Sequence, residues 1–211
     1  MKRRKPYKRP SKIREIIILH VRNNFNSYLI ACIIFLVSVA LGVVFINNIS
    51  DMQTQDLKDY LLTKLKSVQT NEATYLKDLI IENSLLIFLM WLLGLSMIGI
   101  IINYLIIIFK GFCLGYTAAA IALTLGTWKG ISYIFASIFI QNLLFIPAII
   151  IVTTSGMRFF KLVIQDRRKE NILLEGIRHT LISSGMLLVV ILSAFLEIYQ
   201  SGQLIKLIKI C

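Results

Sequence analysis

The sequence predicts an all-α, polytopic integral membrane protein with about five transmembrane helices and a cytoplasmic N-terminus. Its 211 residues are 57% hydrophobic, and the mean hydropathy is +0.77, well above the balance of a soluble domain. Five long stretches carry no charged residue: 23–50, 83–109, 111–128, 130–157 and, slightly shorter, 180–196. About 20 apolar residues cross the hydrocarbon layer, and lipid forces such segments to satisfy their backbone hydrogen bonds within helices.

The distribution of charge predicts how these helices are oriented. Residues 1–25 carry nine Lys or Arg and one acidic residue, and residues 155–179 carry six against three. Residues 50–83 instead carry four Lys and six acidic residues. Lys and Arg accumulate in short loops on the cytoplasmic side. The first two segments are therefore predicted inside and the third outside, an arrangement that five spans satisfy.

The chain begins with a predicted basic cytoplasmic tail and amphipathic helix over 1–28. Ser11 after Pro10 is a plausible N-cap for that helix. The net charge of +12 is concentrated here, which predicts attraction to anionic lipid and no nucleic-acid partner. The first span is predicted over 29–49, and it is too long for the apolar core of a cleaved signal peptide.

The predicted extracytoplasmic loop, 50–83, contains the one sizeable water-exposed segment of the sequence. Four leucines recur in it at helical spacing: Leu57, Leu61, Leu62 and Leu65. An amphipathic helix of this kind needs an apolar surface to cover it. That surface is either the outer leaflet and the protein's own spans or a docking partner, since helix-in-groove recognition uses the same spacing.

The remaining elements follow from the charge-free stretches, with Lys110 and Glu197 expected at span ends. They are spans over 84–109, 111–127, 131–154 and 180–199, a basic cytoplasmic loop over 155–179, and a short extracytoplasmic tail over 200–211. A second possibility is that 111–154 forms a re-entrant hairpin in place of two spans. Both alternatives keep the ends of that segment on the cytoplasmic side.

Small and polar residues within the spans predict where helices pack. The predicted helix-packing positions are Gly111, Gly115, Ala119, Gly126, Gln141, Asn142 and Pro147. Small residues four apart allow two backbones to approach closely, and in lipid this packing drives association. Gln141 and Asn142 are expected to form interhelical hydrogen bonds. The alternative is a polar site of a small membrane transporter or channel.

Catalytic patterns do not occur in the sequence. The two histidines, His20 and His179, are far apart, and no zinc-protease, phosphate-loop or dinucleotide-binding motif is present. The three cysteines have no framework spacing. The sequence therefore predicts no enzyme, no metal site, no cofactor and no disulfide.

The order of features resembles the stage II sporulation protein M family of endospore-forming bacteria. Three segments carry this resemblance: Met90 to Gly99, Phe109 to Tyr116 followed by Trp128-Lys129-Gly130, and Gln141 to Ala148. The resemblance implies a non-catalytic scaffold in the mother-cell membrane at the sporulation septum. There it would localise two peptidoglycan hydrolases, stage II sporulation proteins D and P, for septal thinning and engulfment of the forespore.

Overall fold

The computed structural model describes residues 22, 24–46, 55, 59, 72–125, 140–165 and 169–208. Its long elements are all helices: α2 (Phe25–Ile46), α4 (Glu72–Gly94), α5 (Met97–Leu125), α7 (Ile140–Gln165) and α8 (Lys169–Ile208). Among the described residues there is no strand. The prediction of an all-α membrane protein is confirmed for this part of the chain.

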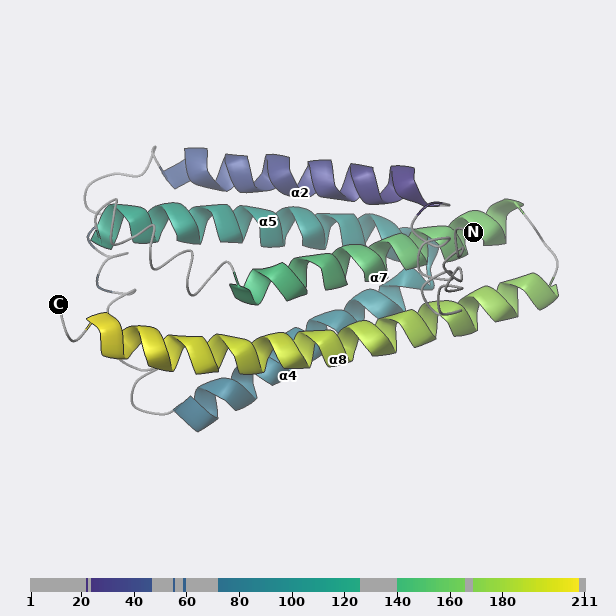
Figure 1. Cartoon of the computed structure of the whole chain (residues 1–211). Helices are drawn as coiled ribbons and strands as arrows, with labels where there is room; N and C mark the ends of the chain where they lie inside the picture. Colours follow the sequence, from purple (N-terminus) through teal and green to yellow (C-terminus); the bar gives the residue numbers. More distant parts are fainter. Residues whose placement is uncertain are drawn as a thin grey trace, which may run out of the picture.

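The five helices form one elongated bundle (Figure 1). One end of it collects the starts of α2, α5 and α8 and the ends of α4 and α7. Consequently α2 and α5 run in the same direction, and they pack along each other. Helix α7 packs on α8, while α4 crosses obliquely and contacts both. A core of buried Ile, Met, Val and Phe side chains joins them, including Ile87, Met90, Ile107, Ile149 and Val190.

Four of these helices are long and apolar enough to cross a membrane: segments Phe25–Ile46, Met97–Leu123, Asn142–Ile164 and Ile172–Leu196. Large apolar side chains cover their outer surfaces; Leu36 is 64% exposed, Ile98 72% and Leu188 66%. So extensive an apolar surface is unfavourable in water and suited to lipid. Helix α4 falls outside this set because its first half carries four charged residues: Glu72, Lys77, Asp78 and Glu82.

The break between the second and third predicted spans is misplaced in the sequence-based prediction. We expected a helix over 84–109 and another over 111–127. The structure instead ends α4 at Gly94, turns at Leu95 and Ser96, and continues α5 through Lys110. The Ser96 Oγ accepts the Gly99 backbone N–H at 2.9 Å, so Ser96 is the N-cap of α5 and fixes the turn.

Lys110 consequently lies near the middle of a helix and not at a span end, so that expectation is wrong. It is 13 residues after the first residue of α5 and 15 before the last. A Lys at the centre of a membrane helix costs roughly 2.5–3.5 kcal/mol. The long uncharged stretches before and after Lys110 allow the helix to continue without a break at this residue.

Other helices extend beyond the predicted spans. Helix α7 continues to Gln165 and α8 begins at Lys169, so most of the predicted loop 155–179 is helical. The predicted tail 200–211 is helical as far as Ile208. The physical reason is that the end of an apolar run marks the edge of the hydrocarbon, whereas Arg, Lys and Glu are good helix formers that continue a helix into water.

We expect the α7–α8 connection to lie in the cytoplasm. In a chain with Cys32, Cys113 and Cys211 replaced by Ser, a Gln165→Cys variant should react with a membrane-impermeant maleimide only in inverted vesicles. Asp59→Cys, in the predicted outer segment, should react in intact cells and serves as the control. Labelling of Gln165→Cys from outside would contradict the predicted orientation, which rests on the basic residues of 155–179.

Candidate functional site

The α2–α5 interface is built on three glycines. A Cβ added to Gly111 would lie 2.9 Å from the Phe35 carbonyl oxygen, and one added to Gly115 would overlap the Val39 carbonyl oxygen. From the opposite side, a Cβ on Gly42 would overlap the Phe112 carbonyl oxygen and lie 2.8 Å from the Tyr116 nitrogen. The two backbones are therefore in direct contact, as small residues at this spacing allow in lipid.

Aromatic side chains close the α2–α5 interface near the end of α2. The rings of Phe45 and Phe112 meet edge to face with centroids 5.5 Å apart, and Phe112 and Tyr116 stack at 6.4 Å. Such pairs add to the stability that burial already provides. The parallel helices α2 and α5 are thus held together by backbone contacts at the three glycines and by aromatic rings near the end of α2.

The other predicted site residues are distributed differently. Ala119 is half-buried on α5, Asn142 is half-buried on α7, and Pro147 is exposed inside α7. Gln141 lies on α7, but its side chain is outside the described residues. The same holds for Gly126 and for the four leucines of the predicted docking stripe, Leu57, Leu61, Leu62 and Leu65. Of this set, the structure brings Gly111 and Gly115 together at the α2–α5 interface.

A second contact region joins α4, α7 and α8, and we call it the His179 junction. Its members are Trp91, Gly94, Ser155, Gly156, His179 and Thr180. His179 is 1% exposed and Ser155 is 4% exposed. The His179 Nδ1 lies 3.0 Å from Ser155 Oγ, and the Nε2 lies 3.2 Å from the Trp91 carbonyl oxygen.

These distances determine which ring nitrogen of His179 carries the proton. A carbonyl oxygen only accepts hydrogen bonds, so Nε2 carries a proton and donates it to Trp91. In the neutral ring, Nδ1 then accepts the hydroxyl of Ser155. One side chain on α8 therefore satisfies polar groups on both α4 and α7, in a region where an unpaired polar group is costly.

Two further contacts tighten the His179 junction. The Trp91 indole Nε1–H donates to Thr180 Oγ1 at 3.1 Å. Gly94 and Gly156 face each other so closely that a Cβ on Gly156 would lie 2.9 Å from the Gly94 Cα. A Cβ on Gly94 would in turn lie 2.6 Å from His179 Nε2. The absence of both side chains is what allows α4 to reach α7 and α8 here.

Ser155 and His179 have the identities of a nucleophile and its base, but their setting does not suit catalysis. Both side chains are buried, so a substrate atom cannot approach Ser155 Oγ. The second ring nitrogen is also engaged with the Trp91 carbonyl. The arrangement joins helices and leaves no reactive group exposed.

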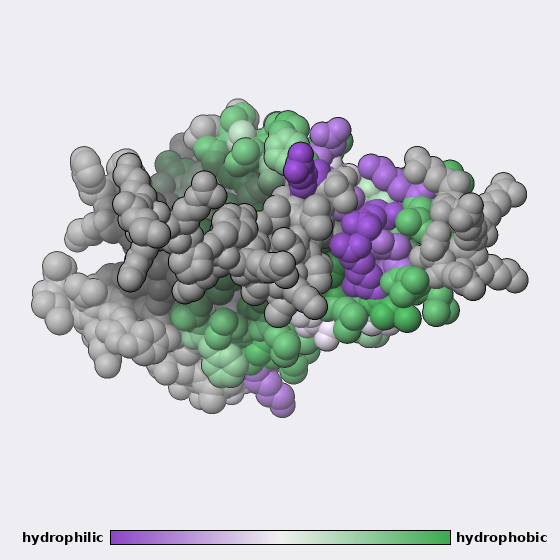
Figure 2. All heavy atoms as spheres, turned by 45° about the vertical axis from the view of Figure 1, so that its right-hand side comes forward, coloured by the Kyte–Doolittle hydropathy of each residue, from purple (hydrophilic) through white to green (hydrophobic). Residues whose placement is uncertain are grey.

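Charged residues continue from the His179 junction toward the α7–α8 connection. Glu175 accepts hydrogen bonds from Arg158 at 2.7 Å and from Arg178 at 3.3 Å. Lys161 Nζ donates to Ser27 Oγ at 3.3 Å, which ties α7 to the start of α2. Figure 2, with this end turned forward, shows hydrophilic surface bordered by apolar side chains. Such a border is expected where helices leave the hydrocarbon.

Comparison with known families assigns the chain. Residues 31–201 match the family described as Stage II sporulation protein M. The chain belongs to the stage II sporulation protein M family. The match covers all of α4, α5 and α7 and most of α2 and α8, so both contact regions lie within the family's common part. Comparisons with curated proteins and with solved structures gave no match.

Membership in the stage II sporulation protein M family makes this a membrane protein of sporulation. The sequence-based interpretation did not identify the His179 junction, because it compared His179 only with the distant His20, and sequence spacing does not show which helices His179 meets. One signal could have found it. Gly94 and Gly156 each occur in a charge-free stretch without a small residue four positions away to explain them, which indicates a crossing contact rather than a parallel seam.

Proposed function

We propose that the chain is a non-catalytic membrane scaffold that recruits and localises peptidoglycan hydrolases at the sporulation septum. The observation that supports this proposal is that several buried polar side chains form hydrogen bonds between helices. Ser155 and His179 link three helices, and Asn103 donates to the Met90 carbonyl oxygen at 3.0 Å between α5 and α4. A frame held together in this way can position other proteins without performing chemistry itself.

The partners we propose are stage II sporulation proteins D and P, on the basis of the family. The cutting of peptidoglycan would be theirs, and thinning of the septum would allow the mother-cell membrane to engulf the forespore. The protein would lie in the mother-cell membrane facing the septum. The basic tail 1–10 would attract anionic lipid on the cytoplasmic side.

We place the docking surface on the leucine stripe of 50–83. A variant with Leu57, Leu61, Leu62 and Leu65 changed to Ser should insert normally but lose both hydrolases in a gentle-detergent pull-down from sporulating cells. Recovery should fall about tenfold or more, because helix-in-groove recognition depends on these apolar anchors. Mass spectrometry of the co-purified proteins measures the result.

The control changes four residues on the opposite side of the same predicted helix, Asp56, Asp59, Thr63 and Lys66, to Ser. It alters as many positions and should leave recovery unchanged. If the wild-type chain recovers the hydrolases and the leucine variant recovers them equally, the stripe is not the docking surface. If the intact wild-type chain recovers neither hydrolase, the scaffold proposal itself fails.

A further inference from the structure

Lys110 lies at the depth of the bilayer centre. A Cβ added to its neighbour Gly111 would meet Phe35 and Ser38, which are in the middle of the membrane helix Phe25–Ile46. An ionisable side chain at this depth is costly, and in membrane proteins it is usually paired inside the protein and marks a site of function. Neither the packing of α2 on α5 nor the His179 junction uses Lys110.

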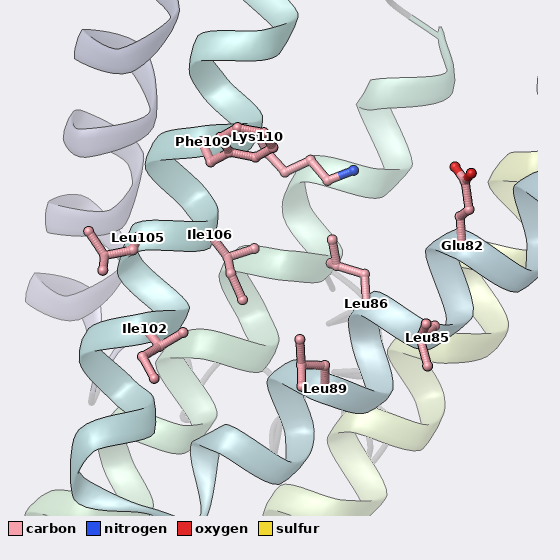
Figure 3. Close-up of a pocket in the computed structure, with 9 residues that line it drawn as sticks. All are labelled: Glu82, Leu85, Leu86, Leu89, Ile102, Leu105, Ile106, Phe109 and Lys110. Carbon is pink, nitrogen blue, oxygen red and sulfur yellow. The ribbon is translucent and has the colours of Figure 1, made fainter.

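Glu82 on α4 lies at a comparable depth. It precedes Ser96 by 14 residues, and Lys110 follows Ser96 by 14. At 1.5 Å per residue, each is about 21 Å along its helix from the α4–α5 turn. Both side chains line one groove, and Figure 3 shows them at the same end of it. The α4–α5 hairpin therefore carries one anion and one cation side by side within the hydrocarbon layer.

Neither charge is neutralised by an ion pair within the described helices. The ion pairs found there are those of Glu175, and none joins Glu82 to Lys110. The Lys110 Nζ lies 5.3 Å from the centroid of the Phe145 ring on α7, and this cation–π contact offsets only part of the cost of removing the ammonium from water. The Glu82 side chain is exposed on the surface of the bundle.

The groove beside these charges has about 560 Å³ between α4 and α5 (Figure 3). Its lining residues repeat with the spacing i, i+3, i+4, i+7 on both helices. They are Glu82, Leu85, Leu86 and Leu89 on α4, and Ile102, Leu105, Ile106 and Phe109 on α5. This spacing forms a continuous stripe along one side of a helix. Two such stripes on neighbouring helices are what one half of a four-helix bundle presents to the other half.

We propose that this groove is the interface with a second copy of the chain. The two copies are related by a two-fold axis along the membrane normal, so that their α4–α5 hairpins face each other. Such an axis leaves every residue at its own depth in the bilayer, and each contact occurs twice. Lys110 of one copy therefore meets the partner's Glu82, and Glu82 meets the partner's Lys110.

Charge complementarity favours a second copy over the other possible occupants of the groove. A lipid would place only its acyl chain at this depth, and an acyl chain gains little by moving there from bulk lipid. A partner helix with a single acidic residue would pair with Lys110 and leave Glu82 without a cation. A second copy supplies both counter-charges. The two pairs form charge-assisted hydrogen bonds in a region of low dielectric constant.

A charge exchange between two copies tests the proposal. Full-length chains with two different tags are co-expressed, and recovery of the second tag with the first is measured in gentle detergent. Wild-type copies should co-purify. Glu82→Lys paired with itself, and Lys110→Glu paired with itself, should each lower recovery at least about tenfold, because like charges then face each other across the interface. Co-expression of the Glu82→Lys chain with the Lys110→Glu chain should restore recovery.

The mixed pair distinguishes contacts between copies from contacts within one chain. In it, each chain carries two like charges, and opposite charges meet only across the interface. If Glu82 and Lys110 served only each other within one chain, mixing the two variants would restore nothing. Failure of the mixed pair, with wild-type copies recovered, would therefore overturn the proposal.

A matched pair of uncharged changes on α4 gives a test that does not place extra charges in the membrane. Leu89 is 48% exposed and lines the groove, whereas Leu92 is 51% exposed and does not. Leu89→Trp should prevent self-association by filling the groove, and Leu92→Trp should preserve it. Equal recovery with both variants, or no co-purification of intact wild-type copies, would overturn the proposal and leave the groove to lipid or to a helix of another protein.

Discussion

Gly115→Leu is expected to separate α2 from α5 and to cause a large loss of stability. The reason is that a Cβ at Gly115 meets the Val39 backbone and not a side chain that could move aside. The two helices must then move apart, and the close backbone contacts at Gly42 and Gly111 along the same interface are weakened as well. We expect a cost of at least about 3 kcal/mol.

Thermal unfolding of purified protein measures this effect. A loss of about 3 kcal/mol lowers the midpoint by roughly 10 °C in a chain of this length. Gly185→Leu is the matched control, because a Cβ at Gly185 has nothing within 4 Å. Gly111→Ala should fall between the two, since its Cβ lies 2.9 Å from the Phe35 oxygen. An equal midpoint for Gly115→Leu and Gly185→Leu would show that the α2–α5 contact is not required.

The glycine seam also illustrates what the sequence could predict. Long charge-free stretches determine the number and class of the helices, because lipid permits little else for them. Gly111 and Gly115 could be placed on a packing face because four-residue spacing puts them on one side of a helix. Their partner, α2, could not be deduced, since spacing within one helix does not identify the helix that lies against it.

The misplaced break at Lys110 has a different cause. Hydropathy divides a sequence at charges, but a helix ends where its backbone finds other hydrogen bonds. Ser96 provides those through Gly99, and Gly94 precedes it where a helix commonly ends. Capping residues inside an apolar stretch therefore decide where a helix ends more strongly than a single charged residue does. Because of the same error, the sequence-based prediction placed Lys110 at the end of a span and not inside the membrane.

The His179 junction depends on contacts between residues far apart in sequence, and one double substitution tests it most sharply. His179→Ala should destabilise the bundle by about 2–4 kcal/mol, because it leaves a cavity and removes the partner of Ser155 Oγ and the Trp91 carbonyl. Gly94→Ala should also destabilise, since its Cβ would lie 2.6 Å from His179 Nε2.

The two changes together should cost less than the sum of their separate effects. Once the imidazole is absent, the new Cβ at Gly94 occupies part of the space it left, and the nearest remaining atom is Gly156 Cα at 3.4 Å. We expect a coupling energy of about 1–2 kcal/mol in the thermal unfolding of the four proteins. Gly185→Ala combined with His179→Ala provides the comparison and should be additive. Additivity at Gly94 as well would mean that α4 does not pack against the His179 ring at Gly94.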